Sequence, residues 1–316
     1  MDSKIRIGIS TCLLGEKVRY DGGHKFDSLI VHTLGPYLEY IPVCPEVEAG
    51  FPIPREAFRL IGDPDAPRMI TVRTRQDVTD RMLDWARRRV RELESENLCG
   101  FIFKSDSPSS GMERVKVYTE TGMPIKRGIG LFARAFLEHF PLLPTEEDGR
   151  LRDARLRENF IERIFTLKRW RDMLAGNNSK SGLVDFHTRH KLMLLAHSPV
   201  HYKKMGQIVA ALTDAQLPAI QKRYEAILMD ALKIKTTVKK NLNVLQHILG
   251  YFKNELSSAE KQQILEVFED YRNEHIPLIV PITLLGFFVR KYGEPYLSKQ
   301  FYLNPHPIEL QLRNHV

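Results

Sequence analysis

Short apolar runs alternate with helix-like patterns over the first 140 residues, and this alternation limits the possible fold more than any other feature. Four apolar runs have the length of buried strands: IRIGIS (5–10), YIPV (40–43), GFIFK (100–104) and RVKVY (114–118). Apolar residues recur at helical spacing in three further segments, 28–40, 77–93 and 130–140. The pattern predicts an α/β unit, a parallel, Rossmann-like sheet with helices on its faces.

The second half of the chain has a different pattern, in which almost every segment is helical. Helical spacing covers residues 155–174, 183–197, 199–212, 216–249, 258–274 and 276–289. Between the halves, PLLPTEEDGRL (141–151) combines two prolines, an acidic triplet and a glycine. We therefore predict an α/β domain over residues 1–142 and an all-α domain over residues 150–316.

Charge is distributed unevenly between these two parts. Residues 1–148 contain 21 Lys and Arg against 23 Asp and Glu, whereas residues 149–316 contain 26 against 16, a net charge of +10. A basic unit joined to a near-neutral one is typical of proteins that bind polyanions such as nucleic acid. A solvated basic surface that keeps the protein soluble is the alternative.

Membrane and secretory classes are disfavoured. The most apolar stretch, 276–289, has 14 residues and two prolines, whereas a membrane span needs about 20 apolar residues. The start, MDSKIRIGIS, lacks the pattern of a signal peptide. The three cysteines are too few for a disulfide scaffold. We expect a cytoplasmic protein without a membrane partner.

Polar or thiol side chains follow three of the predicted strands. Cys12 follows the first strand, Cys44 and Glu46 follow the second, and the loop SDSPSSG (105–111) follows the third. Because ligands bind beyond the carboxyl ends of parallel strands, these groups should meet at one edge of the sheet. Two thiols, a carboxylate and hydroxyls could hold a metal or an iron–sulfur cluster. Two buried cysteines and ordinary turns explain the same residues equally well.

Longer motifs give these positions a family resemblance. STCLLGEKVRYDGG, PVCPEVEAGFPIPR and KSDSPSSG resemble the three motifs of the thiouracil desulfurase (TudS-type) family. In the second half, LVDFHTRHKLMLLAHS, NVLQHILGYFK and YLNPHPIELQLRN resemble the helical domain that is often fused to it. The fusion resembles RudS-type enzymes, and the resemblance implies removal of sulfur from 4-thiouridine in tRNA.

The resemblance also implies a cofactor, a [4Fe–4S] cluster held by three cysteines with one iron open. The ligands would be Cys12, Cys44 and residue 110, but this chain has Ser110 where the family pattern, S-P-S-C-G, has cysteine. Serine ionises less readily and is a harder ligand, so we expect the cluster to be absent or unstable. Cys99 begins the third strand, five residues and roughly 16 Å from the loop, and cannot replace it.

Roles for other residues follow from this chemistry and, for Ser107, from the resemblance. Glu46 would activate water for attack on the thiocarbonyl carbon, and Ser107 would orient the base or pass a proton. Arg19 and Tyr20 would contact the substrate. An ST-turn at Ser107 and a turn-forming DGG beside Tyr20 are the structural alternatives. No GxxxxGK[ST] loop is present in the sequence, so ATP is not implied.

Basic residues of the second half are candidates for contacts to RNA phosphates. They are Arg189, Lys191, Lys203, Lys204, Lys235, Lys239 and Lys240. Helical spacing would place Lys235 and Lys239 on one face, although each lysine alone is better explained as a solvated residue than as an RNA contact. Two other functions remain open: a non-catalytic RNA-binding protein with a decayed site, and a desulfurase of free thiouracil. The sequence does not indicate an oligomeric state.

Overall fold

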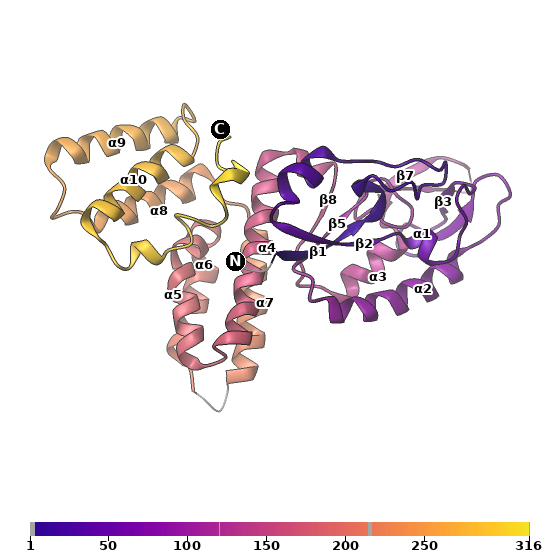
Figure 1. Ribbon diagram of the computed structural model, residues 1–316, viewed down its shortest axis with the longest axis horizontal. Coiled ribbons are helices and arrows are strands. Elements are labelled where there is room, and N and C mark those ends of the chain that lie inside the picture. Colours follow the sequence, from indigo (N-terminus) through magenta and orange to yellow (C-terminus); the bar gives the residue numbers. More distant parts are fainter. Residues whose placement is uncertain (1–3, 120, 214–216, 316) are drawn as a thin grey trace. The chain divides into compact units, whose positions relative to one another are not determined.

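The structure is a computed structural model that describes residues 4–119, 121–213 and 217–315. It divides into two compact units, Met1–Leu156 and Arg157–Val316. The first contains the strands and the second is helical (Figure 1). No helix among the described residues is both long and apolar enough to cross a membrane.

A four-stranded parallel sheet forms the centre of the first unit. Its order is β2 (Leu38–Val43), β1 (Ile5–Ser10), β5 (Gly100–Phe103) and β8 (Thr145–Glu147), and all three pairings are parallel. The chain leaves β1 to form β2 on one side and later returns to form β5 on the other. Such a reversal of strand order opens a crevice at the carboxyl ends of the strands. The predicted α/β class is confirmed.

Two amphipathic helices pack together beside this sheet. They are α2 (Thr79–Glu92) and α3 (Leu131–His139) (Figure 1). Their contact is aromatic: the Trp85 and Phe132 ring centroids lie 5.2 Å apart, and Phe136 lies 4.6 Å from Phe101 of β5. Apolar side chains at helical spacing, buried against one sheet face, explain why both helices were predictable from sequence.

A second sheet was not predicted. Its order is β4 (Arg68–Thr71), β3 (Phe58–Ile61), β6 (Val115–Tyr118) and β7 (Pro124–Gly128). The pairing of β3 with β6 is parallel and the other two are antiparallel. We expected the run 114–118 in the parallel sheet, and it lies in this one instead. The other three strands have four or five residues and carry arginines, so they lack an apolar run.

Two further expectations for the first unit differ from the structure. The segment 28–40 forms only a π-helical turn, Leu29–Leu34, before β2 begins, because Pro36 lacks the N–H that a continuing helix needs. The segment 141–151, predicted as the domain boundary, contains β8, and the first unit continues to residue 156. Three residues, Thr-Glu-Glu, give no hydrophobic signal for a strand.

Seven helices make up most of the rest of the described chain: α4 (Ala154–Gly176), α5 (Lys180–His197), α6 (Pro199–Ala210), α7 (Leu217–Lys233), α8 (Val238–Gly250), α9 (Ser258–Arg272) and α10 (Ile279–Tyr292). The predicted run 216–249 is two helices, because the Thr237 side chain accepts the Lys240 amide and begins α8. Lys235 therefore lies between helices, and the shared face that we predicted with Lys239 does not exist.

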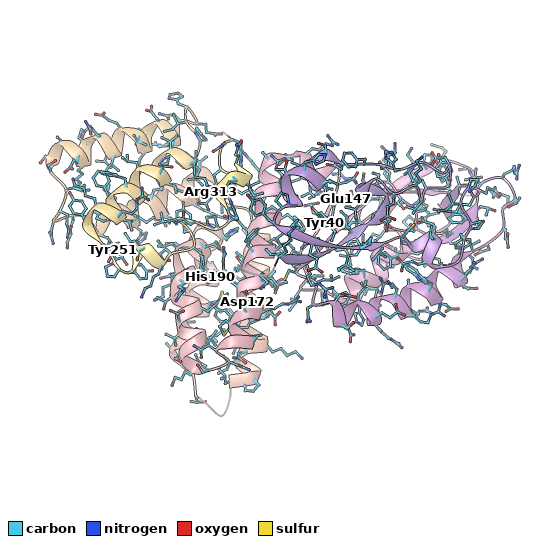
Figure 2. The ribbon with its side chains drawn as sticks, in the orientation of Figure 1. Tyr40, Glu147, Asp172, His190, Tyr251 and Arg313 are labelled. Carbon is cyan, nitrogen blue, oxygen red and sulfur yellow. The ribbon has the colours of Figure 1, made fainter. Side chains whose placement is uncertain are left out.

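Charged side chains are buried in the helical unit. Arg313 is 5% exposed, and its guanidinium lies 3.3 Å from a Glu158 oxygen and 2.8 Å from a Glu162 oxygen (Figure 2). His197 lies 3.2 Å from the other Glu162 oxygen. The cluster ties the C-terminal segment to α4 and α5.

Candidate active site

A cavity of about 430 Å³ opens where β1, β2 and β5 end. Its wall comes from four places in the chain: the residues after β1, the start of α1 (Pro45–Glu48) after β2, the start of β3, and the serine loop after β5. Cys12, Cys44, Glu46, Ser107 and Ser110 all line it. The predicted meeting of the three strand ends is confirmed.

The two cavity thiols are nearly buried. Cys12 is 9% exposed and Cys44 is 8% exposed. Burial raises the pKa of Cys12 to about 11, although Arg19 and Lys104 act in the opposite direction. Burial, together with the charge of Glu46, raises the pKa of Cys44 to about 12. Both thiols are therefore protonated at neutral pH.

Glu46 lies between Cys44 and the serine loop. It occupies the first turn of α1, and its side chain is 14% exposed. Oε1 accepts a hydrogen bond from the Ser109 hydroxyl at 2.5 Å. Oε2 lies 3.8 Å from Cys44 Sγ and 3.7 Å from an Arg55 nitrogen. The carboxylate thus faces the cavity with a thiol, a hydroxyl and a guanidinium around it.

Hydrogen bonds hold the serine loop in place, and each of its serines makes different contacts. Ser107 Oγ accepts the amides of Ser109 at 3.3 Å and Ser110 at 3.1 Å, which is the ST-turn geometry. The first-turn amides of α3 bind the loop carbonyls, with Phe132 N donating to Ser109 O at 2.9 Å. Sequence reasoning missed Ser109, which is the serine that contacts Glu46.

Ser110 lies where the third cluster ligand was predicted. It is 3% exposed and lines the cavity with both cysteines. Its hydroxyl is 3.5 Å from that of Ser109. Cys99 is 2% exposed at the far end of β5, where its amide donates to Arg6 O at 2.8 Å. It does not line the cavity, so the prediction that it cannot replace residue 110 is confirmed.

Arg19 and Tyr20 form the rim of the cavity. Tyr20 is 43% exposed, and the Arg19 guanidinium lies 5.4 Å from the centre of its ring. Arg55 fixes this rim, because its amide donates to Tyr20 O at 2.8 Å and its side chain donates to Val18 O at 3.0 Å. The arginine that faces Glu46 is thus also the arginine that positions the rim.

Lys104 is a cavity residue that sequence reasoning missed. Its amine lies 2.9 Å from Asp148 Oδ2 and 2.8 Å from Ser105 Oγ, and its amide donates to Ser10 Oγ at 2.9 Å. Nearby, Glu147 of β8 accepts the Met112 amide at 2.7 Å, just beyond the serine loop (Figure 2). The acidic segment 146–148 that looked like a linker therefore braces the site.

The predicted RNA-contacting residues lie in the helical unit and differ in their exposure and in their contacts with the rest of the protein. Lys203, Lys204, Lys235 and Lys239 are exposed. Arg189 pairs with Asp185 at 2.8 Å, and the Lys240 amine donates to the His197 and Lys235 carbonyls. Lys191 is half-buried. Lys240 has a structural role at the end of α5, which a charge count cannot reveal.

Comparison with known families identifies both parts. The 2-thiouracil desulfurase family matches residues 7–148, and a family of unknown function, DUF1722, matches residues 191–307. The chain belongs to the 2-thiouracil desulfurase family and carries a DUF1722 region after it. Membership in this family indicates an enzyme that removes sulfur.

Individual relatives resemble parts of this desulfurase. The uncharacterized protein YbgA of Escherichia coli K12 is 30% identical over 51% of this chain and 95% of its own length. The uncharacterized protein YbbK of Bacillus subtilis 168 is 30% identical over 33% of this chain and 71% of its own length. Among solved structures, a [4Fe–4S]-dependent thiouracil desulfidase, TudS, shares 25% identity with a TM-score of 0.38, over 48% of this chain and 95% of its own.

The cavity donors do not fit a cluster that needs three protein thiolates. The cavity offers the thiols of Cys12 and Cys44 and the hydroxyl of Ser110. A serine hydroxyl is a much weaker acid and a harder donor than a thiol. Within the described residues, no group of three or more His, Cys, Asp or Glu is placed to hold a metal ion.

Proposed function

We propose that this protein acts on 4-thiouridine in tRNA and replaces the sulfur of the base with oxygen from water, giving uridine and hydrosulfide. The observation that carries the proposal is the cavity at the three strand ends, where Cys12, Cys44 and Glu46 converge in a chain of the 2-thiouracil desulfurase family. Its volume of about 430 Å³ lies in the range of small-molecule sites.

The residues of the cavity suit addition of water to a thiocarbonyl carbon. Glu46 would take a proton from the attacking water as its oxygen bonds to C4. The proton that remains on the added oxygen then passes to sulfur as the C4–O double bond forms. The C–S bond breaks with its electrons going to sulfur, which leaves as hydrosulfide. Ser109 and Arg55 hold the carboxylate at its two oxygens. Arg19 and Tyr20 at the rim would contact the base or its ribose.

The tRNA part of the proposal is supported by the helical unit. The excess of positive charge lies in residues 149–316. Exposed lysines on α6 and α8 would supply phosphate contacts that do not depend on sequence. A desulfurase of free thiouracil would not need this charge.

Ser110 favours a second candidate function, binding of thiolated RNA without turnover. With two thiols and a hydroxyl, we expect the chain to hold no stable [4Fe–4S] cluster and to release little sulfur. The cavity and the rim would still accept the base.

One experiment tests the function and the ligand set together. The chain and its Ser110→Cys variant are treated anaerobically with iron and sulfide, and iron, labile sulfide and absorbance are measured. Both are then incubated with tRNA containing 4-thiouridine and, separately, with free 4-thiouracil. We expect a cluster and conversion to uridine in Ser110→Cys, and a trace at most in the unsubstituted chain.

The outcomes separate the candidates. A Ser110→Cys protein that holds its cluster but leaves both substrates unchanged would overturn desulfuration. Tight binding of thiolated tRNA by the unsubstituted chain without sulfur release would support the second candidate. Close to four irons per chain with Ser110 in place would contradict our reading of the donor set.

A further inference from the structure

The second sheet of the N-terminal unit carries a row of cations that crosses three strands. Lys116 of β6 is directly opposite Lys126 of β7. On the other side, Leu60 pairs with Val117 in the parallel ladder, so the residues one place earlier, Arg59 and Lys116, are also neighbours. Adjacent strands lie about 4.8 Å apart, so the three Cα atoms span only about 10 Å. We call Arg59, Lys116 and Lys126 the cationic row.

A β-bulge adds a fourth cation to this row. The register between β6 and β7 shifts after Val115, which pairs with Gly128, so Arg127 has no partner across the strand. A bulge leaves the extra residue unpaired and turns its side chain away from the regular alternation. Lys126 and Arg127 are both exposed, as is Lys116. The sheet thus presents consecutive cations at its β7 edge.

Among the described residues, no carboxylate forms an ion pair with the cations of this surface. Within the described part of the chain, Arg59, Lys116, Lys126 and Arg127 take part in no ion pair, whereas the neighbouring Arg68 is paired with Asp77. Arg59 donates to Val72 O at 3.2 Å and lies 5.4 Å from the centre of the Tyr118 ring. Like charges directly opposite each other destabilise a sheet. A row of this kind costs stability unless an anion covers it.

The row lies close to the cavity along the strand. Phe58, at the start of β3, lines the cavity, and Arg59 is the next residue. Successive side chains of a strand point to opposite faces, so the row lies behind the cavity wall rather than inside it. A free base in the cavity cannot touch it. A polynucleotide with one base in the cavity can reach it with phosphates of neighbouring nucleotides.

We propose that the cationic row, with Arg127, binds the phosphate backbone of the RNA whose thiolated base enters the cavity. The inference rests on the proposed function, which supplies the polynucleotide. It gives the N-terminal unit its own RNA contact, although the net charge of residues 1–148 is −2. An acidic protein segment would be drawn by the same charges, but the cavity beside the row takes a base rather than a peptide.

The test compares two pairs of substitutions in the full-length chain. Lys116→Gln/Lys126→Gln removes two charges from the row. The control, Arg88→Gln/Arg91→Gln, removes two charges from exposed positions of α2 in the same unit. The affinity of each protein for an unmodified tRNA transcript is measured across a range of salt concentrations. Far-ultraviolet circular dichroism and thermal unfolding check that both variants fold.

We expect the row variant alone to lose affinity, with the slope of log affinity against log salt smaller in magnitude by about 2. Equal slopes in the row and control variants, or no binding of the transcript by the unsubstituted chain, would overturn the proposal. Folding of the row variant with unchanged affinity would also overturn it.

Desulfuration of free 4-thiouracil, measured in the Ser110→Cys background, separates this proposal from the function on which it rests. The row substitutions should leave this reaction unchanged, because the free base does not reach the row. If no variant desulfurated 4-thiouracil but the row variant still lost RNA affinity, the proposed catalytic function would be wrong. The proposed RNA-binding role of the cationic row would stand. Loss of the reaction in the row variant alone would show damage to the cavity and contradict the assignment.

Discussion

The two oxygens of Glu46 have different neighbours. Oε1 accepts the short hydrogen bond from Ser109, and Oε2 faces Cys44 and Arg55 at longer distances. The pairing with Arg55 that could have explained Glu46 as a purely structural residue is present, but it does not remove the carboxylate from the cavity wall. Oε2 lies at longer distances from its neighbours, so under the proposed function it is the atom that we expect to take a proton from water.

We predict that Glu46→Gln, in the Ser110→Cys background, slows sulfur release by about 10²–10⁴-fold. The amide keeps the shape and cannot take a proton. Single-turnover conversion of 4-thiouridine measures the effect, with iron content and RNA affinity measured alongside. Glu48→Gln is the control, because Glu48 accepts the Cys44 amide at 2.8 Å and does not line the cavity. An unchanged rate with full iron content would exclude the catalytic role, whereas joint loss of iron and activity would indicate a positioning role.

Among single residues, the sequence revealed the groups with distinctive chemistry. It did not reveal the residues that enter the site through contacts with segments distant in sequence. Cys12, Cys44 and Glu46 follow strands and were predictable from that position. Ser109 was one serine among several, and only the α3 amides that bind its carbonyl show why it faces Glu46. Lys104 meets Asp148 across 44 positions of sequence, a separation that no local pattern reports.

At the scale of elements, the junction of the serine loop with α3 holds the site together. Gly130 precedes α3, and a Cβ atom there would lie 2.5 Å from the Ser109 carbonyl and 2.8 Å from the Ser110 nitrogen. The close contact is with backbone, which cannot move aside as a side chain can. The glycine is thus required by the approach of the two segments, since its own φ of −61° suits any residue.

We predict that Gly130→Ala destabilises the first unit by about 1–3 kcal/mol, because the added methyl group displaces the loop that carries Ser109 and Ser110. Differential scanning calorimetry should show that the midpoint temperature of unfolding falls by several degrees. Gly149→Ala is the matched control in the same unit, where the nearest atom to an added Cβ is Ser105 Oγ at 3.6 Å. A midpoint temperature equal to that of the control variant would contradict the close contact at Gly130.

The buried charges of the helical unit give a prediction with a pH dependence. Burial and the neighbouring Glu162 raise the pKa of Glu158 to about 7, although Arg313 acts against them. Burial also acts to raise the pKa of Glu162, but its hydrogen bond to His197 and the charge of Arg313 hold that pKa low. Without Arg313, two carboxyls share a buried space with less positive charge, and the pKa of each rises.

We therefore predict that Arg313→Met lowers the free energy of unfolding of the helical unit by about 3–5 kcal/mol at pH 8. A carboxyl whose pKa is higher when folded stabilises the fold at low pH and loses that contribution as the pH rises. The difference in unfolding free energy between the variant and the unsubstituted chain should therefore shrink toward pH 5. Urea unfolding at both pH values measures it, with Arg290→Met at an exposed position of α10 as control. If the variant lost as much unfolding free energy at pH 5 as at pH 8, the raised pKa values that we assign to the buried carboxyls would be contradicted.

Long elements with one apolar face were predictable, and short or cationic ones were not. The helices α2 and α3 and the strands β1 and β5 appeared at their expected places. The strands β3, β4 and β7 were missed because each has only four or five residues and arginines or lysines interrupt its apolar residues. The missed sheet is the one that bears the cationic row, so the pattern that hid it from prediction is also the basis of its proposed role.

At the scale of the whole molecule, the proposed function would have the two units offer an RNA different kinds of contact. The helical unit has the larger charge excess, spread over exposed lysines such as Lys203 and Lys204 of α6. The N-terminal unit has the cavity and a compact row of cations. Under the proposed function, an RNA bound by both units would gain affinity mainly from the helical unit. The cavity would fix its register, because the thiolated base would enter there.

This division predicts the salt dependence of binding by the full-length chain. Affinity for a tRNA transcript should fall steeply between low and moderate salt, because bound phosphates release their counterions. Lys203→Gln/Lys204→Gln should reduce the slope by about 2, whereas Lys253→Gln/Lys261→Gln, also exposed and outside the predicted contacts, should leave it unchanged. Both pairs remove the same net charge, so a difference between them reports contact rather than overall attraction. Equal slopes in the two variants would mean that the helical unit attracts RNA only through its total charge. Since α6 contributes no residue to the cavity, desulfuration of 4-thiouracil in the Ser110→Cys background should proceed at the same rate in both.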